Sequence, residues 1–334
     1  MKYTELSANQ LRVAQDCKQV FEAYQDANKA LVQYQGGLSW KTVGGQEYLI
    51  KVFNRRGGNR SLGPRSADTE KLYAEFYAAK ERISERHAGL KESLREVAGM
   101  ARGVGVNRVP KIVAATLRAL EEKGLLGGSL IVIGTNAMYA YESAAGVRFD
   151  AGLLATMDMD FLWDARVTLK LGAQQEQFSE SGLLAVLQDV DRSFEVAGKS
   201  HFRAVNKEGF YVDLVKQAPN PPWKKGEPLQ MAPGDLVPAW LPNIKWLLSS
   251  EKFSSLVIGQ DGIPAPIVAP DPRAFAVYKS WLSKQDEREP EKRARDEVQA
   301  LATLELVKEK FPHLKLDVNA ERMFPKSVRA GLGE

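Results

Sequence analysis

The sequence of 334 residues contains a single cysteine, Cys17, and only three histidines, which are far apart. One cysteine excludes an internal disulfide, and neither residue type is clustered as a zinc site requires. No apolar stretch approaches the roughly 20 residues that a membrane helix needs. The amino terminus also lacks the apolar segment of a signal peptide. We therefore expect a soluble, cytoplasmic protein without a membrane partner.

Charge of either sign is not in large excess, because 46 lysines and arginines oppose 42 aspartates and glutamates. A net charge of +4 permits a polyanionic partner but does not require one. No internal repeat or low-complexity tract is present. The length is sufficient for two or three packed units.

The segment ATMDMDFLW places Asp158 and Asp160 two residues apart in an apolar run. Side chains alternate across a strand, so both carboxylates point to one face while Met159 and Phe161 point to the other. Two adjacent ionised groups in an apolar segment are costly unless a cation or strong donors compensate them. Oxygen ligands suit Mg²⁺ or Mn²⁺. The pair predicts a divalent metal site, with a solvent-facing strand edge as the alternative.

Two further segments carry candidate site residues. The apolar run SLIVIG ends at Gly134, and Thr135 and Asn136 then open a helix, whose free amides and dipole suit a phosphate. Asn136 has the simpler alternative of a helix cap. Asp213 is the only charge within the apolar run 211–215, which predicts a third metal ligand or a pair with a buried arginine.

The pattern divides the chain into three regions. Residues 1–128 are mostly helical, residues 129–218 alternate strand and helix as a mixed sheet with helices does, and residues 219–334 begin with a proline-rich connector. The fold class is therefore α+β. Apolar periodicity predicts helices at 11–35, 66–100, 110–123, 181–191, after Pro272 and from Arg295. Strands are predicted at 129–134, 158–163, 167–171, 200–206, 209–216, 245–248 and 254–258, and a hairpin that turns at Gly44-Gly45 at 38–53.

The hairpin continues into NRRGGNRSLGPRS, which contains Arg55, Arg56, Arg60 and Arg65 among glycines. Composition alone favours a solvated loop. The alternative is a basic arm that grips the phosphates of a nucleic acid.

Taken together, these residues resemble the nucleotidyltransferases of the DNA polymerase β superfamily. That pattern is an apolar strand, a G-S, G-G or G-T turn at a helix start, a D-x-D strand and a later acidic strand residue. Gly134-Thr135, Asp158-Met159-Asp160 and Asp213 match it. More narrowly, RSADTEKLYAEF, VGVNRVP, APDPRAFAVYKSWLS and RDEVQAL resemble a bacterial family of nucleotidyltransferase-like proteins, similar in layout to toxins of toxin–antitoxin and abortive-infection systems.

The resemblance implies roles for individual residues. Asp158 and Asp160 would bind the metal-bound triphosphate, and Asp213 the second ion. Gly134, Thr135 and Asn136 would contact the nucleotide phosphates. The toxin-like relatives carry an arginine before the D-x-D strand and a lysine in a later helix, which Arg148 and Lys279 match, and an Arg-Asp pair that Arg295-Asp296 resembles. From the residues alone, Arg148 could lie on the surface, Lys279 could extend to solvent, Arg295-Asp296 could be a local ion pair, and Tyr139, Tyr141 and Trp163 could be core.

The predicted function is metal-dependent transfer of a nucleoside monophosphate from an NTP to an acceptor, with release of pyrophosphate. RNA, tRNA in particular, is the favoured acceptor, because the basic hairpin arm and C-terminal helix could flank the site. A toxin-like role would bring a cognate antitoxin as a partner. A protein or small-molecule acceptor, a catalytically silent binding module and a nuclease are the alternatives.

Overall fold

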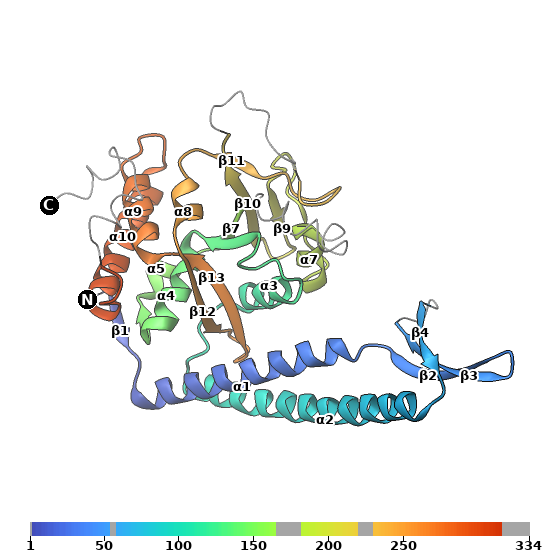
Figure 1. Ribbon diagram of the computed structural model, residues 1–334. Coiled ribbons are helices and arrows are strands. Elements are labelled where there is room, and N and C mark those ends of the chain that lie inside the picture. The colour runs from blue at the N-terminus through green and yellow to red at the C-terminus, as the bar shows by residue number, and fades with distance from the viewer. Residues whose placement is uncertain (1, 54–57, 165–181, 220–229, 316–334) are drawn as a thin grey trace. The chain divides into compact units, whose positions relative to one another are not determined.

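The computed structural model describes residues 2–53, 58–164, 182–219 and 230–315 (Figure 1). The fold is α+β, as predicted. The chain forms two compact units. The hairpin unit is Arg12–Val106, and the core unit combines Met1–Leu11 with Asn107–Glu334. The division therefore comes at Val106, and the expected boundaries near residues 128 and 218 lie inside the core unit.

Two long antiparallel helices dominate the hairpin unit, α1 (Ala8–Gln33) and α2 (Ala67–Gly103), both predicted (Figure 1). The ring of Tyr24 stacks on His87, with ring centroids 5.0 Å apart, where the helices pack. Helix α2 begins at Ser66 because the side chains of Ser66 and Thr69 cap each other's backbone amides.

A three-stranded antiparallel sheet joins these helices, with the order β2 (Gly37–Val43), β3 (Gln46–Val52) and β4 (Asn59–Pro64). Gly44 and Gly45, both with positive φ, make the predicted tight turn between β2 and β3. Strand β4 corrects the sequence prediction, which made residues 54–66 a loop. Its residues pair with β3, which satisfies an edge that would otherwise be open.

The core unit is built on a mixed sheet whose strand order is β5-β7-β10-β9-β8, with β11 paired to β10. Strands β7 and β10 are parallel, and β5 and β9 run antiparallel to their neighbours. The strands are β5 (Leu130–Ile133), β7 (Asp158–Trp163), β8 (Glu195–Val196), β9 (Arg203–Val205), β10 (Tyr211–Gln217) and β11 (Ala239–Leu241). The strand predicted at 167–171 lies outside the described residues.

Each face of this sheet packs against a separate apolar cluster. Met159, Phe161 and Trp163 of β7 belong to the main core, whereas Leu162, on the same face as the aspartates, joins a second cluster with residues of α8 and α9. The face that carries Asp158 and Asp160 is therefore apolar at its far end. Helices thus cover this face beside the carboxylates.

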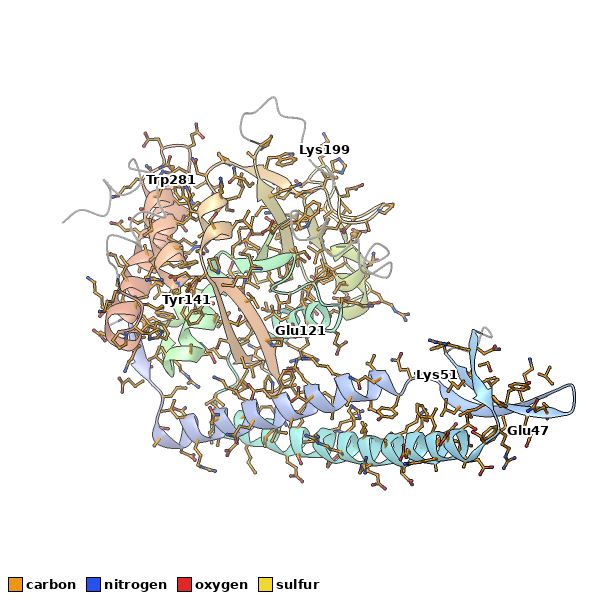
Figure 2. The ribbon with its side chains drawn as sticks, in the orientation of Figure 1. Glu47, Lys51, Glu121, Tyr141, Lys199 and Trp281 are labelled. Carbon is orange, nitrogen blue, oxygen red and sulfur yellow. The ribbon has the colours of Figure 1, made fainter. Side chains whose placement is uncertain are left out.

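The remaining elements surround the sheet (Figure 1). They are β1 (Tyr3–Glu5), α3 (Lys111–Glu122), η1 (Thr135–Ala137), α4 (Met138–Ala145), β6 (Val147–Phe149), α5 (Ala151–Leu154), α7 (Leu183–Val190), α8 (Lys245–Ser249), β12 (Lys252–Ile258), β13 (Pro264–Pro270), α9 (Pro272–Ser283) and α10 (Pro290–Lys310). The predicted strand at 245–248 is wrong, because these residues form α8. The interpretation of Tyr139, Tyr141 and Trp163 as core residues is confirmed, since all three are buried. Figure 2 shows Tyr141 inside the core unit, where its hydroxyl donates to the carbonyl of Pro270.

Among the described residues, no helix combines the length and apolar character that crossing a bilayer requires.

Candidate active site

The turn after β5 is shaped to receive a carboxylate. Gly134 has a φ of +64°, which L side chains rarely adopt. A Cβ atom at this position would lie 2.0 Å from Oδ2 of Asp160, so the carboxylate of Asp160 rests directly against the glycine backbone. Strand pairing produces this contact, because Ile133 and Asp160 are partners in the β5–β7 ladder. Glycine is required here both for its conformation and for its missing side chain.

The predicted aspartates lie on one face of the sheet. Asp158 and Asp160 share that face of β7, and Asp213 is the direct partner of Asp160 on β10. Burial and the negative charges of Asp158 and Asp213 together raise the pKa of Asp160 to about 7, although Lys279 and Arg203 act to lower it. Three carboxylates are therefore held together, and a cation brought to this face would favour their ionised forms.

Asp213 already has a cationic partner. The guanidinium of Arg203, on β9, donates from Nε to Oδ1 and from Nη2 to Oδ2, both at 2.6 Å. The alternative that Asp213 pairs with an arginine is thus what the structure shows. Arg203 is itself partly exposed and rests over the ring of Tyr211, 4.7 Å from its centroid.

A second group of charges comes from α9 and α10. The ammonium of Lys279 is buried and donates to Asp296 at 2.6 Å, and Arg288 pairs with the other oxygen of the same carboxylate. Asp296 is fully buried. The anticipated local pair of Arg295 with Asp296 is therefore wrong, and Asp296 instead joins two cations from elsewhere. Nε of Arg295 is buried and has no hydrogen-bond partner among the described residues.

These groups line one pocket with a volume of about 540 Å³. Its charged lining on the sheet side consists of three aspartates and Arg203, whereas on the helix side cations predominate, with Glu287 among them. The lining comprises Ile133, Gly134, Thr135, Asp158, Asp160, Arg203, Asp213, Val215, Leu241, Pro242, Asn243, Ile244, Leu247, Phe275, Tyr278, Lys279, Trp281, Leu282, Gln285, Glu287, Arg288, Lys292 and Arg295. Carboxylates that favour a cation and cations that favour an anion therefore lie in the same cavity.

Comparison with known proteins agrees with this geometry. Residues 111–324, more than half of the chain, match the model of a family described as Nucleotidyltransferase. The chain belongs to this nucleotidyltransferase family. No curated protein and no solved structure matches it. The nucleotidyltransferase is accordingly an enzyme that transfers nucleotidyl groups.

Two residues of the nucleotidyltransferase that were expected to contact the nucleotide interact with other parts of the protein instead. Asn136 donates from Nδ2 to the backbone carbonyl of Asp158 at 2.7 Å, so it holds the start of β7. Arg148 lies in β6, where its charge acts on the buried carboxylate of Glu142. Neither is among the side chains that line the pocket. Thr135 does line it, and its hydroxyl accepts from Nε2 of Gln299 at 3.2 Å.

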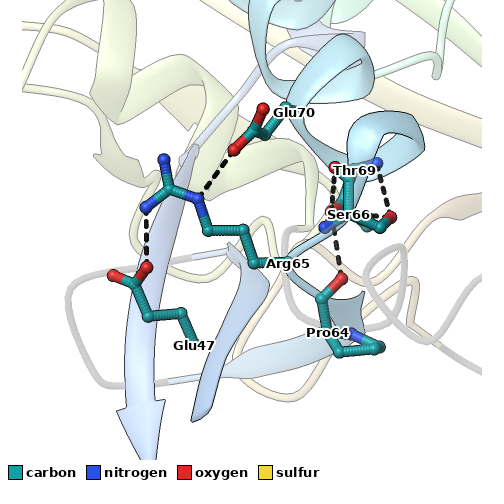
Figure 3. A network of polar contacts seen from close by, with 6 residues as sticks. All are labelled: Glu47, Pro64, Arg65, Ser66, Thr69 and Glu70. Carbon is teal, nitrogen blue, oxygen red and sulfur yellow. Dashed lines mark hydrogen bonds and ion pairs between the residues drawn. The ribbon is translucent and has the colours of Figure 1, made fainter.

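The arginines predicted to bind an acceptor differ from one another. Arg55 and Arg56 lie outside the described residues. Arg60 is exposed on β4. Arg65 is held by Glu47 and Glu70, at 2.6 and 2.8 Å (Figure 3). Its guanidinium also lies over the ring of Trp40. Arg65 therefore fixes the sheet of the hairpin unit to the start of α2.

The carboxylates of Asp158, Asp160 and Asp213 are suitable ligands for a divalent ion, although they do not surround a common centre. Within the described part of the chain, no three acidic, histidine or cysteine side chains form a ready metal centre. Both oxygens of Asp213 are taken by Arg203. The oxygen donors and the raised pKa of Asp160, caused by burial and the neighbouring carboxylates, nevertheless suit a hard cation.

Proposed function

We propose that the nucleotidyltransferase transfers a nucleoside monophosphate from an NTP to an acceptor with the aid of Mg²⁺ or Mn²⁺, and releases pyrophosphate. One observation carries this proposal. Asp158, Asp160 and Asp213 line the same pocket as the Gly134 turn and a group of cations. This combination suits phosphoryl chemistry, in which the protein positions reactants and neutralises charge. It agrees with the resemblance to the DNA polymerase β superfamily.

Asp158, Asp160 and Asp213 would hold the divalent ion. When bound, the ion would neutralise charge on the phosphates and lower the pKa of an acceptor hydroxyl. The protein's own contribution is placement. Gly134 seats the carboxylate of Asp160, and Asn136 fixes the backbone of Asp158 through its carbonyl.

The triphosphate would lie against the basic wall of the pocket. Arg295 has a buried Nε without a partner among the described side chains, so a phosphate oxygen would satisfy it. Arg288 and Lys279 add positive charge on the same side. Thr135 can donate its hydroxyl hydrogen, because the contact with Gln299 uses the oxygen as acceptor. The apolar lining from Leu241, Ile244 and Leu247 offers a surface for the base and ribose.

RNA is the acceptor that we favour, a tRNA 3′ end in particular. The exposed Lys292 continues the basic wall of the pocket, and Arg60 offers a further exposed charge on the hairpin unit. Phosphates of a polyanion are attracted to such groups. A toxin-like role, neutralised by an antitoxin partner, would follow from modification of tRNA. Arg65, held by two glutamates, and Arg148, outside the pocket, have no role in the proposed binding.

The experiment that tests the acceptor uses each of the four α-labelled NTPs with Mg²⁺. Separate reactions offer total tRNA, cellular protein and a panel of small hydroxyl compounds. Label in the tRNA fraction, with an added mass of one nucleotide, would support the proposal. Label in protein or in a small molecule would identify that molecule as the acceptor in place of RNA, and shortened RNA would indicate a nuclease. Absence of label from every acceptor would contradict nucleotidyl transfer.

A further inference from the structure

Arg203 and a metal ion compete for the same two oxygens. The guanidinium binds Asp213 through two parallel, charge-assisted hydrogen bonds of 2.6 Å. Such bidentate pairs are among the stronger polar contacts in proteins. A cation that uses Asp213 as a ligand must displace at least one of these bonds. Among the residues that the structure describes, no guanidinium donates to the carboxylate of Asp160, which lies directly opposite on β7 and borders Gly134 instead.

The side chain of Arg203 can move into the pocket when a cation displaces it from Asp213. Its side chain keeps about a third of its surface exposed, whereas the side chain of Asp213 keeps 10%. Arg203 also lines the pocket. The guanidinium also lies over the rings of Tyr211 and Phe202, with centroids 4.7 and 5.6 Å away, so it can rotate while it keeps contact with an aromatic ring. A guanidinium released into the pocket would find its next acceptor in a phosphate of the nucleotide.

We infer that Arg203 is a positioning residue, which occupies both oxygens of Asp213 until a phosphate of the substrate binds its guanidinium instead. Cation binding at Asp213 is therefore coupled to nucleotide binding. This inference rests on the proposed function. Asp160 and the oxygen of Asp158 that does not accept from the Thr156 hydroxyl would bind a first ion, and the nucleotide would complete the site for a second. The coupling would limit occupation of the complete metal site when no substrate is present.

The direct test measures binding of Mn²⁺ to the full chain by the electron paramagnetic resonance signal of the free ion. Without nucleotide, Arg203→Gln should bind Mn²⁺ at Asp213 about tenfold more tightly than the wild type, because the competing donors are gone. The double variant Arg203→Gln/Asp213→Asn should lose this gain. Arg192→Gln is the matched control, because Arg192 is exposed and does not line the pocket. Equal affinity of Arg203→Gln and wild type would overturn the inference.

The second part of the test repeats the Mn²⁺ measurement in the presence of a non-hydrolysable NTP analogue. With the analogue bound, the difference in Mn²⁺ affinity between wild type and Arg203→Gln should shrink, because the wild-type guanidinium has moved to a phosphate. An unchanged difference would overturn the coupling. If Arg203→Gln does not fold, Arg203→Lys replaces it. A single ammonium leaves one oxygen of Asp213 open, so tighter Mn²⁺ binding than wild type is still required.

Steady-state kinetics separates a positioning role from a structural one. Arg203→Gln should lower the Mg²⁺ concentration at half-maximal rate and raise KM for the NTP, whereas general damage would worsen both. If the wild type transfers label but Mn²⁺ affinity does not respond to Arg203, the inference fails and the proposed function stands. If the wild type transfers nothing to any acceptor, the proposed function fails, and the inference that rests on it fails too.

Discussion

At the scale of single residues, the most demanding position of the site is Gly134, which functions through the side chain it lacks. We predict that Gly134→Ala reduces the rate of nucleotidyl transfer by at least about 100-fold, because a Cβ atom 2.0 Å from Oδ2 would push Asp160 out of place. The measurement is initial rate per folded protein, with folding checked by circular dichroism.

Gly198→Ala is the matched control for that change. Gly198 also has a positive φ, of 50°, but a Cβ atom there would meet nothing within 4 Å. Both variants carry a backbone cost for positive φ, which is larger at Gly134 because its ψ of −158° places it in a region essentially restricted to glycine, and only Gly134→Ala carries the clash. Equal rates for the two variants would show that the contact with Asp160 is unimportant.

Glu142 gives a prediction on pH. Its buried carboxylate accepts from the amide of Phe149, and burial raises its pKa to about 7 although Arg108 lowers it. The folded protein thus binds this proton more tightly than the unfolded chain does. Glu142 therefore makes the free energy of unfolding fall as pH rises from about 4.5 to 7.

Substitution of Glu142 by glutamine should remove this dependence. Between pH 5 and pH 8, the stability of Glu142→Gln relative to wild type should increase by roughly 1 to 3 kcal/mol. Urea denaturation at both pH values measures the change. A difference between the two proteins that does not vary with pH would contradict the assignment.

Residues of the site differ in how far sequence could reveal them. The positions of Asp158, Asp160 and Gly134 follow from strand alternation and a turn signal, which are local. Arg203 was missed, although a hairpin centred on Glu208 would place it opposite Asp213. Arg288 could not be found, because its pairing with Asp296 depends on how α9 and α10 pack.

At the scale of elements, the ion pairs of Asp296 join α9 to α10. Asp296→Asn leaves the buried ammonium of Lys279 without its carboxylate, and we predict a loss of about 3 to 5 kcal/mol in stability. The double variant Lys279→Met/Asp296→Leu should recover most of this loss, because both charges of the buried pair are gone and Arg288, whose side chain is 29% exposed, can be solvated by water. Urea denaturation of the three proteins measures both effects.

The same double variant tests the role of Lys279 in the site. Because Lys279 also lines the pocket, the double variant should stay stable but transfer nucleotide much more slowly. Wild-type rates would mean that Lys279 is purely structural. An Asp296→Asn protein as stable as wild type would contradict the account of the helix junction.

Element prediction failed where tertiary contacts outweigh local pattern. The pattern predicts a strand at 245–248, but Leu247 packs as part of helix α8 in the second apolar cluster. Strand β4 was missed because the segment 54–66 that contains it is rich in glycine and arginine, and its pairing depends on β3. The helices were predicted closely, since their apolar periodicity and caps are local signals.

At the scale of the whole molecule, the proposed RNA acceptor gives the hairpin unit a share of RNA binding. Arg60, on β4, pairs in register with Lys51 of β3, which brings two cations together on the sheet. If RNA is the acceptor, Arg60→Glu should weaken tRNA binding several-fold and reduce its salt dependence. Arg86→Glu is the control, because Arg86 is exposed on α2 away from that sheet. Filter binding at several salt concentrations measures both, and equal effects would indicate only non-specific attraction.

The most direct test of the central claim is pyrophosphate release from NTP as a function of Mg²⁺ concentration, with the acceptor identified above. The account predicts metal-dependent release by the wild type and by Asp150→Asn, whose exposed side chain lies outside the pocket. It predicts release at least about 100-fold slower for Asp158→Asn and for Asp160→Asn, because the cation loses a ligand. Equal release by all four proteins, or release that ignores Mg²⁺, would contradict it.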